Sequence, residues 1–163
     1  MTPTAGHTLI LLRHGKSDWS GGEPDHERPL AERGERQAPE AGMWLQSSGL
    51  RLDRAVVSPA TRARRTWELV AGELAEPPTP VQDERVYAAS AEDLLEVVQD
   101  LPDGARTVVL VGHNPGLEDL VELLVGQPLR LTTSALAVID VETAWAEAGP
   151  GAGVLRTAGR PPS

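Results

Sequence analysis

Three side chains in this sequence have the chemistry needed to hold and transfer a phosphoryl group. Arg13 and His14 follow one short apolar segment, and Arg62 lies just after a second. A neutral imidazole can attack phosphorus and form a covalent intermediate. Arginine binds phosphate oxygens through paired hydrogen bonds and neutralises their charge during transfer. His14 is therefore a candidate nucleophile, and the nearby positive charges would favour its unprotonated form.

The apolar segments that precede these residues are predicted to be buried strands. They cover residues 8–12, 54–57 and 107–111, and the third ends in Gly112 and His113. If the strands are parallel, their carboxyl ends meet at one edge of the sheet, where sites form in such folds. Ser58-Pro59 and Asn114-Pro115 each predict a helix N-cap followed by proline in the first turn. Two helix N-termini, which favour phosphate, would then lie beside His14 and His113.

Predicted strands and helices alternate along the rest of the chain, which indicates one α/β domain. We expect a three-layer α/β/α sandwich with a mainly parallel central sheet over residues 1–163, with loose tails at 1–7 and 158–163. One helix is expected at 31–47, with a kink at Pro39, and another after a capping box at 90–93. A strand is expected at 134–141, with a hairpin partner at 154–157. The polar segment 15–30 is predicted to be a long lid-like loop pinned to the body by Trp19.

Composition excludes several classes of protein. A net charge of −9 argues against a nucleic-acid-binding or anionic-membrane surface. The chain has no cysteine and no apolar run long enough to span a membrane, so we expect a cytoplasmic protein without disulfides. Two histidines flanked by arginines, without a carboxylate cluster, make a poor metal site. We therefore predict neither a metal nor an organic cofactor.

Taken together, the motifs resemble those of the histidine phosphatase superfamily. The resemblance rests on Arg13-His14-Gly15, on the stretch 58–66 and on the stretch 112–115. Further matches at 13–19, at Arg28-Pro29-Leu30 with Arg33-Gly34, and at 132–135 resemble the SixA-type phosphohistidine phosphatase branch. The resemblance implies that His14 is phosphorylated and that Arg13, Arg62 and His113 bind the phosphoryl group. Lys16 and Arg28 are further candidates for the rim of the site.

One departure from the family concerns the acid that protonates the leaving oxygen. The usual sequence context of that residue is absent, and Glu84 is the nearest candidate by order along the chain. Imidazole leaves more readily than an alkoxide, so cleavage of a P–N bond depends less on a strong general acid. The missing context therefore favours phosphohistidine over phosphate esters.

Three functions are compatible with these residues. The leading one is a phosphatase with a phosphorylated protein, carrying phosphohistidine, as its partner. The second is a phosphomonoesterase acting on a small phosphorylated metabolite, which would need an acid such as Glu84. The third is a module that binds phosphorylated partners without turnover, for which arginines alone would suffice, so the presence of both His14 and His113 argues against it.

Overall fold

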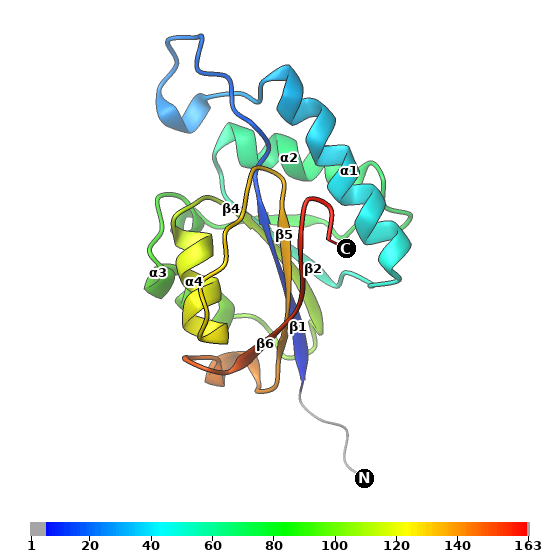
Figure 1. Ribbon diagram of the computed structural model, residues 1–163, viewed down its shortest axis with the longest axis vertical. Helices are drawn as coiled ribbons and strands as arrows, with labels where there is room; N and C mark the ends of the chain where they lie inside the picture. The colour runs from blue at the N-terminus through cyan, green and yellow to red at the C-terminus, as the bar shows by residue number, and fades with distance from the viewer. Residues whose placement is uncertain (1–5, 163) are drawn as a thin grey trace.

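The computed structural model describes residues 6–162 and shows one six-stranded sheet between two pairs of helices (Figure 1). The strand order is β3-β2-β4-β1-β5-β6. The strands are β1 (His7–Arg13), β2 (Arg54–Val57), β3 (Pro80–Gln82), β4 (Thr107–Gly112), β5 (Leu136–Val141) and β6 (Gly153–Gly159). The helices are α1 (Glu32–Ser48), α2 (Thr61–Ala71), α3 (Ala91–Gln99) and α4 (Gly116–Val125), with 3-10 turns η1 (Asp25–Glu27), η2 (Glu84–Val86) and η3 (Trp145–Glu147).

The sheet is mostly parallel, as predicted. β1 and β2 both pair with β4 in parallel, whereas β5 runs antiparallel between β1 and β6. Arg13 lies opposite Gly112, and Val57 lies opposite Val111, so three strands end at the same level. The polar residues that follow them therefore meet at one edge of the sheet, which is the upper edge in Figure 1.

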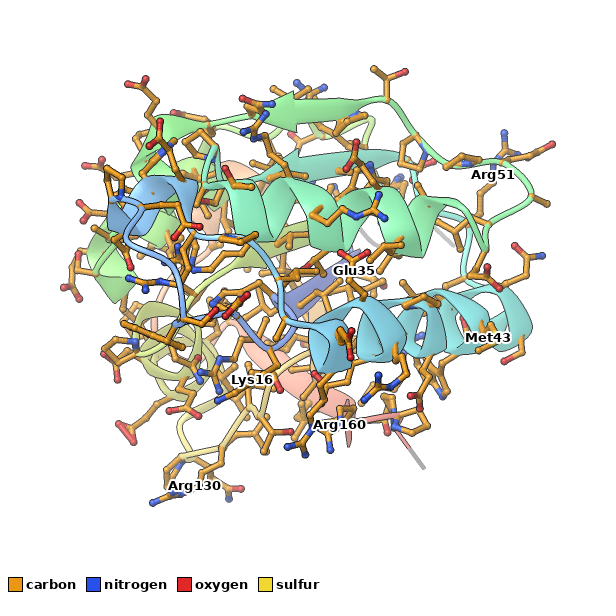
Figure 2. The ribbon with its side chains drawn as sticks, turned by 90° about the horizontal axis from the view of Figure 1, so that it is seen from above. Lys16, Glu35, Met43, Arg51, Arg130 and Arg160 are labelled. Atoms are coloured by element: carbon orange, nitrogen blue, oxygen red, sulfur yellow. The ribbon has the colours of Figure 1, made fainter. Side chains whose placement is uncertain are left out.

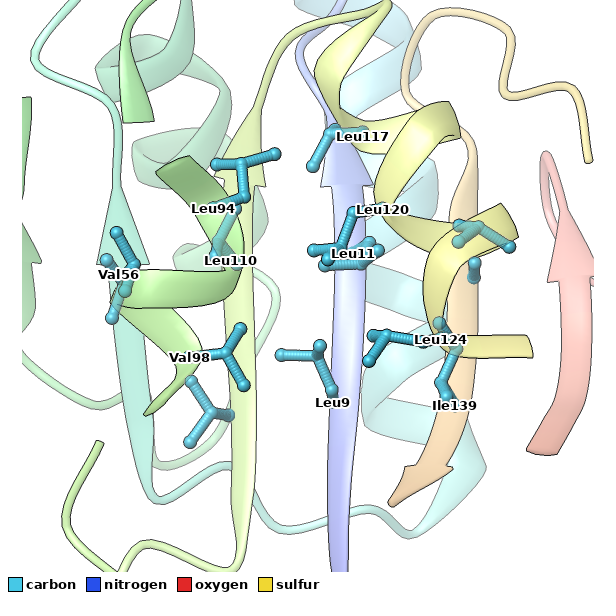
Figure 3. Close-up of a cluster of buried hydrophobic side chains, with 14 of the residues drawn as sticks. Leu9, Leu11, Val56, Leu94, Val98, Leu110, Leu117, Leu120, Leu124 and Ile139 are labelled. Atoms are coloured by element: carbon cyan, nitrogen blue, oxygen red, sulfur yellow. The ribbon is translucent and has the colours of Figure 1, made fainter. Parts of the chain in front are cut away.

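The two faces of β1 fill two separate cores. Leu9 and Leu11 pack with α3 and α4, as Figure 3 shows, while Ile10 and Leu12 pack with α1 and α2. All four side chains are fully buried, so β1 is apolar on both faces, as expected for a central strand. The three-layer sandwich predicted from the sequence is confirmed.

Helix α1 continues through Pro39 to Ser48 as one unbroken helix. Its buried face includes Ala38, Ala41 and Leu45, the stripe expected from the sequence. Gly49 ends the helix with a φ of 78°, a left-handed conformation that glycine adopts without strain. The predicted capping box at Ser90 and Asp93 is also present at the start of α3.

The predicted N-caps of α2 and α4 are wrong. α2 begins at Thr61 after Ala60, and α4 begins at Gly116 after Pro115, and neither has a side-chain cap. The two expected caps make other bonds: Ser58 Oγ accepts from the Ala60 amide at 3.2 Å, and Asn114 Nδ2 donates to the Leu131 carbonyl at 2.8 Å. The chain therefore makes an extra turn between each strand and its helix.

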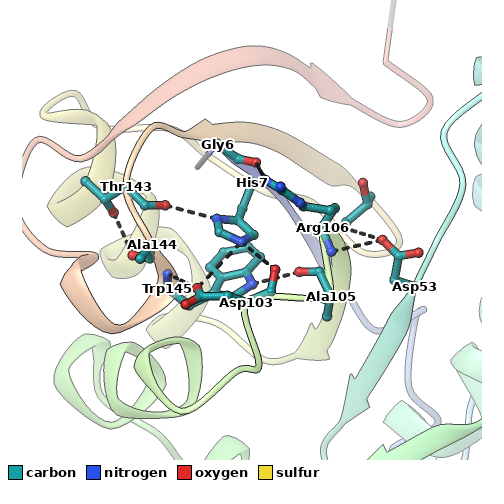
Figure 4. A network of polar contacts seen from close by, with 10 residues as sticks. Gly6, His7, Asp53, Asp103, Ala105, Arg106, Thr143, Ala144 and Trp145 are labelled. Atoms are coloured by element: carbon teal, nitrogen blue, oxygen red, sulfur yellow. Dashed lines mark hydrogen bonds and ion pairs between the residues drawn. The ribbon is translucent and has the colours of Figure 1, made fainter. Parts of the chain in front are cut away.

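His7 does not belong to a loose tail, contrary to the prediction. Its ring is buried, bonds the carbonyls of Thr143 and Asp103 at 3.0 Å each, and packs 4.4 Å from the ring of Trp145 (Figure 4). These contacts fasten the start of β1 to the end of the sheet that lies away from the site. The rest of the predicted tail, residues 1–5, lies outside the described residues.

The carboxyl-terminal segment is also ordered, so the predicted tail at 158–163 is wrong for residues 158–162. Ala158 and Gly159 belong to β6, and Pro162 folds back to pair with Gly159. Arg160 Nη1 donates to the Thr133 carbonyl at 3.3 Å, which brings this segment to the edge where β1 ends. No helix within residues 6–162 has the length and hydropathy that crossing a membrane requires.

Candidate active site

The ends of β1 and β4 bring two histidine rings together. The ring centroids of His14 and His113 lie 5.0 Å apart with a tilt of 55°. The His14 amide donates to the Gly112 carbonyl at 3.1 Å, which couples the two strand ends directly. His14 is 6% exposed, so its ring is almost completely covered by the surrounding residues.

A backbone carbonyl determines the tautomer of His14. Its Nδ1 lies 2.7 Å from the carbonyl oxygen of Gly15. Because a carbonyl only accepts hydrogen bonds, Nδ1 carries the proton and donates it. Nε2 therefore has a free lone pair, as a nucleophile toward phosphorus requires.

Both histidines are held in their neutral forms. Burial lowers the pKa of His14 to about 4; the Gly15 carbonyl opposes this shift, and the charges of Arg62 and Arg13 add to it. Burial is also the main cause that lowers the pKa of His113 to about 3, followed by His14 and Arg62. The site thus keeps the His14 lone pair available over the whole range near neutral pH.

This arrangement predicts the titration of the His14 ring. With its pKa lowered to about 4, His14 stays neutral as the pH falls through 6.5 and gains its proton only near pH 4. Ring nitrogen chemical shifts, followed by NMR, should therefore show a neutral His14 at about pH 5.5, where an unperturbed histidine is mostly protonated. Arg62→Ala should raise the pKa of His14, because it removes one of the charges that lower it. A wild-type protein whose His14 is protonated at pH 5.5 would contradict the lowered pKa of this residue.

The two arginines flank the histidines from different elements. Arg13, at the end of β1, donates from Nη1 to the Leu131 carbonyl at 3.1 Å, and burial lowers its pKa. Arg62 lies in the first turn of α2, is 8% exposed and donates from Nη1 to the Asp25 carbonyl at 2.6 Å. Both guanidinium groups are close enough to lower the pKa values of the two histidines.

The segment 15–30 brings an unexpected carboxylate, Asp25, to the site. Its side chain accepts hydrogen bonds from Tyr87 at 2.6 Å, from Arg28 at 2.9 Å and from Arg62 at 3.1 Å. These bonds, led by that of Tyr87, hold the pKa of Asp25 far below its usual range. Nothing in the sequence around Asp25 marks it as a site residue, because two of its three partners come from α2 and from the segment after η2.

Ser58 contacts His113 rather than capping a helix. The Ser58 hydroxyl lies 2.7 Å from His113 Nε2, and the Tyr87 ring packs edge-on 5.7 Å from the His113 ring. Within residues 6–162, His113 Nδ1 and Arg13 Nε are buried without a hydrogen-bond partner. Two nitrogens that can donate are thus left free beside His14, which suits the oxygens of a phosphoryl group.

Comparison with known proteins identifies the family. A family model described as histidine phosphatase superfamily (branch 1) matches residues 9–87. An uncharacterized protein of Mycobacterium tuberculosis is 34% identical over 155 residues, which cover 88% of this chain and 96% of that protein. The structure of a protein assigned as phosphohistidine phosphatase SixA from Nakamurella multipartitia superposes with a TM-score of 0.80 at 28% identity, covering 97% of this chain and 98% of that one.

The chain belongs to the histidine phosphatase superfamily. The SixA structure supports the SixA-type branch that the sequence motifs indicated. A 2,3-bisphosphoglycerate-dependent phosphoglycerate mutase of Beijerinckia indica is 39% identical over 84 residues, or 47% of this chain and 39% of the mutase. The superfamily thus contains both phosphatases and enzymes of small phosphorylated metabolites.

In this histidine phosphatase, Thr66 of α2 holds the backbone after His14 in place. Its hydroxyl accepts from the Gly15 amide at 3.0 Å and donates to the Arg62 carbonyl at 2.7 Å. A Cβ on Gly15 would lie 3.0 Å from the Gly34 carbonyl oxygen, so α1 packs against the same turn without space for a side chain. Thr66 therefore connects the turn that follows His14 to the helix that carries Arg62.

Thr66→Val tests this positioning role. Valine has nearly the same shape as threonine but lacks the hydroxyl, so the buried Gly15 amide loses its hydrogen-bond partner. This loss should lower the free energy of unfolding by about 1–3 kcal/mol. Turnover should fall about tenfold, because even small displacements of reacting groups are costly. Thermal unfolding and steady-state kinetics measure the two effects. Thr61→Val, on the partly exposed first turn of the same helix, is the control; equal effects of the two variants would contradict the role of Thr66.

The remaining candidates lie at or outside the rim. Lys16 is exposed, and Arg28 is bound to Asp25 rather than free for substrate. Trp19 does not pin the loop to the body as predicted: it is 67% exposed, and the Arg28 guanidinium stacks on it at 3.5 Å. Glu84 is exposed in η2, and no hydrogen bond or ion pair of the described residues links it to the histidines or arginines of the site. Among residues 6–162, no group of three or more histidine or acidic side chains could hold a metal ion.

Proposed function

We propose that this protein is a phosphohistidine phosphatase that removes a phosphoryl group from a partner protein through a covalent intermediate on His14. One observation carries the proposal: the Gly15 carbonyl holds the proton of His14 on Nδ1 and leaves Nε2 free among Arg13, Arg62 and His113. Each of these groups has a part in the transfer.

In the first step, His14 Nε2 attacks phosphorus and the P–N bond of the substrate breaks. The substrate reacts in the form whose other ring nitrogen is protonated, so that the imidazole leaves as a neutral ring and keeps that proton. Arg13 and Arg62 neutralise the oxygens of the phosphoryl group as it moves. The Ser58 hydroxyl lies 2.7 Å from His113 Nε2, and we infer that it donates to this nitrogen, which leaves the ring proton on Nδ1 for one phosphoryl oxygen.

In the second step, water attacks phosphorus from the side opposite His14. The P–N bond to Nε2 breaks, its electron pair returns to the ring, and both protons of the water leave on dihydrogen phosphate. The proton of His14 stays on Nδ1, hydrogen-bonded to the Gly15 carbonyl, throughout, so the enzyme returns to its starting tautomer.

The state of the carboxylates at the site supports phosphohistidine as the substrate. A general acid must be protonated near neutral pH, but three donors hold Asp25 ionised, and Glu84 lies exposed without a link to the site. An alkoxide leaving group needs such an acid, whereas the imidazole of phosphohistidine does not. The similarity to the SixA protein points in the same direction.

Asp25→Asn tests the role of that carboxylate. Asp25 competes with a phosphoryl group for Arg62, so the amide should tighten inhibition by inorganic phosphate about three- to tenfold. Turnover of phosphohistidine should change less than about threefold, since no proton is taken from Asp25. Asp18→Asn, in the same loop, should change neither value, because the Asp18 carboxylate accepts from the amide and hydroxyl of Ser20 and not from an arginine. A loss of turnover that grows with the leaving-group pKa would show instead that Asp25 acts as an acid.

A panel of substrates tests the function itself. We expect efficient hydrolysis of a protein phosphorylated on histidine and of phosphoimidazole, with slow hydrolysis of sugar and nucleotide phosphates. Efficient turnover of metabolite esters without turnover of the phosphoprotein would favour the small-molecule phosphomonoesterase. Tight binding of the phosphoprotein without release of phosphate would favour the binding module.

A further inference from the structure

A second hollow of about 420 Å³ adjoins the active site and is lined mainly by cations. We call it the basic basin. Its charged lining residues are Arg13, Lys16, Arg33, Arg130 and Arg160, with Glu118 as the one acid. They come from four separate parts of the chain that the fold brings to the same edge of the sheet. Figure 2 labels Lys16, Arg130 and Arg160 on one side of the molecule.

The charges of the basic basin are not neutralised within the described part of the chain. None of its five cations is in an ion pair there, whereas Arg62, Arg65, Arg85 and Arg156 each pair with a carboxylate. Glu118 accepts from the Leu131 amide at 2.7 Å, and its charge raises the pKa of Arg13, so this single carboxylate offsets only part of the charge of the five cations. The hollow thus concentrates positive charge in a protein whose net charge is −9, which favours an anionic ligand at this place.

The basin is connected to the active site through Arg13, which lines both. Lys16, Arg33, Arg130 and Arg160 are exposed, whereas Arg13 is partly buried, directly precedes His14 and helps to lower its pKa. The basin also includes Arg33 and Thr133, which belong to the sequence motifs that the phosphoryl pocket does not use.

The side chain of Gln37 links two cations of the basin. With the Gln37 amide oriented to satisfy its neighbours, its oxygen accepts from Arg160 at 3.0 Å and from Arg33 at 3.3 Å, and its nitrogen donates to Thr133. The cations are thus arranged before any ligand arrives.

We propose that the basic basin binds acidic side chains that flank the phosphohistidine of a partner protein. This inference rests on the proposed function and names the surface chemistry of the substrate. Four exposed cations around a hollow open to solvent match several carboxylates on a protein surface. A second phosphate of a metabolite, by contrast, would be satisfied by one or two of them. The same positive charge would speed the encounter of the two proteins against the negative field of the rest of the chain.

The test uses the double variant Arg33→Glu/Arg130→Glu, whose residues lie outside the phosphoryl pocket. With a phosphohistidine protein that has acidic flanking residues, kcat/KM should fall about tenfold or more, mainly through KM. With phosphoimidazole, kcat/KM should stay within about twofold of the wild-type value. Arg51→Glu, an exposed site far from the basin in Figure 2, makes the same single change of charge as each substitution and should affect neither substrate. Replacing the acidic flanks of the phosphoprotein by their amides should reduce the effect of the double variant.

Three results would overturn the proposal. One is an unchanged KM for the acidic phosphoprotein, and another is an equal loss on phosphoimidazole. The third is an effect of the double variant that appears only with a bisphosphorylated metabolite. Binding of an unphosphorylated glutamate-rich peptide separates this proposal from the proposed function, because it needs no turnover. The wild type should bind the peptide at low salt and the double variant should not, even if no phosphoprotein is hydrolysed.

Discussion

His14→Ala should abolish turnover while leaving the fold intact. Removing a covalent nucleophile whose partners remain in place lowers kcat by about four orders of magnitude or more. The residual rate would come from Arg13, Arg62 and His113, which can still bind the phosphoryl group. Steady-state kinetics with phosphoimidazole would measure the loss.

A stability measurement must accompany the His14 experiment, because the side chain is buried. His14→Asn keeps a polar group near the Gly15 carbonyl and serves as a second variant. Both should unfold at temperatures close to that of the wild type and both should be inactive. A folded His14→Ala variant that keeps more than a few per cent of wild-type turnover would contradict the role of His14 as nucleophile.

Arg62→Ala should have the second largest effect. It removes a nearly buried guanidinium that is placed to contact the phosphoryl oxygens, and loss of one such donor costs about 10²–10³ in kcat. Arg62→Lys keeps the charge but not the two parallel donors, so it should recover only part of the loss.

The neighbouring Arg64 offers a matched control for Arg62. It lies on the same helix, is exposed, and bonds to the Pro59 carbonyl and the Thr61 hydroxyl. Arg64→Ala should leave turnover within about twofold of the wild type. Equal losses in the two variants would show that the effect of Arg62 comes from the helix and not from contact with substrate.

The part of the site that could be predicted from the sequence is the part that the strands determine. Buried apolar strands predict a parallel sheet, and a parallel sheet brings the residues after its strands to one edge. That rule predicts that Arg13, His14 and His113 lie close together. The pairing of Arg13 with Gly112 confirms that β1 and β4 end at the same level of the sheet. The position of Arg62 near the site could also be predicted, because it lies only a few residues after the end of β2.

The remaining parts of the site depend on contacts that the sequence does not encode locally. Asp25 reaches Arg62 through an irregular loop, and Tyr87 joins it from beyond η2. Ser58 has the pattern of a helix cap, but the turn it makes with Ala60 places its hydroxyl on His113 instead. The basin likewise combines cations from distant parts of the chain, and one of them, Arg160, joins the others only because β6 ends beside Thr133.

The tautomer of His14 is the detail with the greatest chemical consequence. The sequence indicated that a backbone carbonyl could hold one ring nitrogen, but it did not identify the carbonyl. The structure shows that it is that of Gly15, the next residue, at 2.7 Å from Nδ1. Under the proposed function, the phosphoryl group would be carried on Nε2, because Nδ1 holds the proton.

Trapping the phosphoryl enzyme tests the central claim most directly. The protein is mixed briefly with a phosphohistidine protein or phosphoimidazole, quenched in alkali and examined by mass spectrometry and ³¹P NMR. The account predicts one phosphoryl group, bound to Nε2 of His14, stable in alkali, labile in acid and absent from His14→Ala. Turnover without any such adduct, or an adduct on His113, on Ser58 or on Nδ1 of His14, would contradict it.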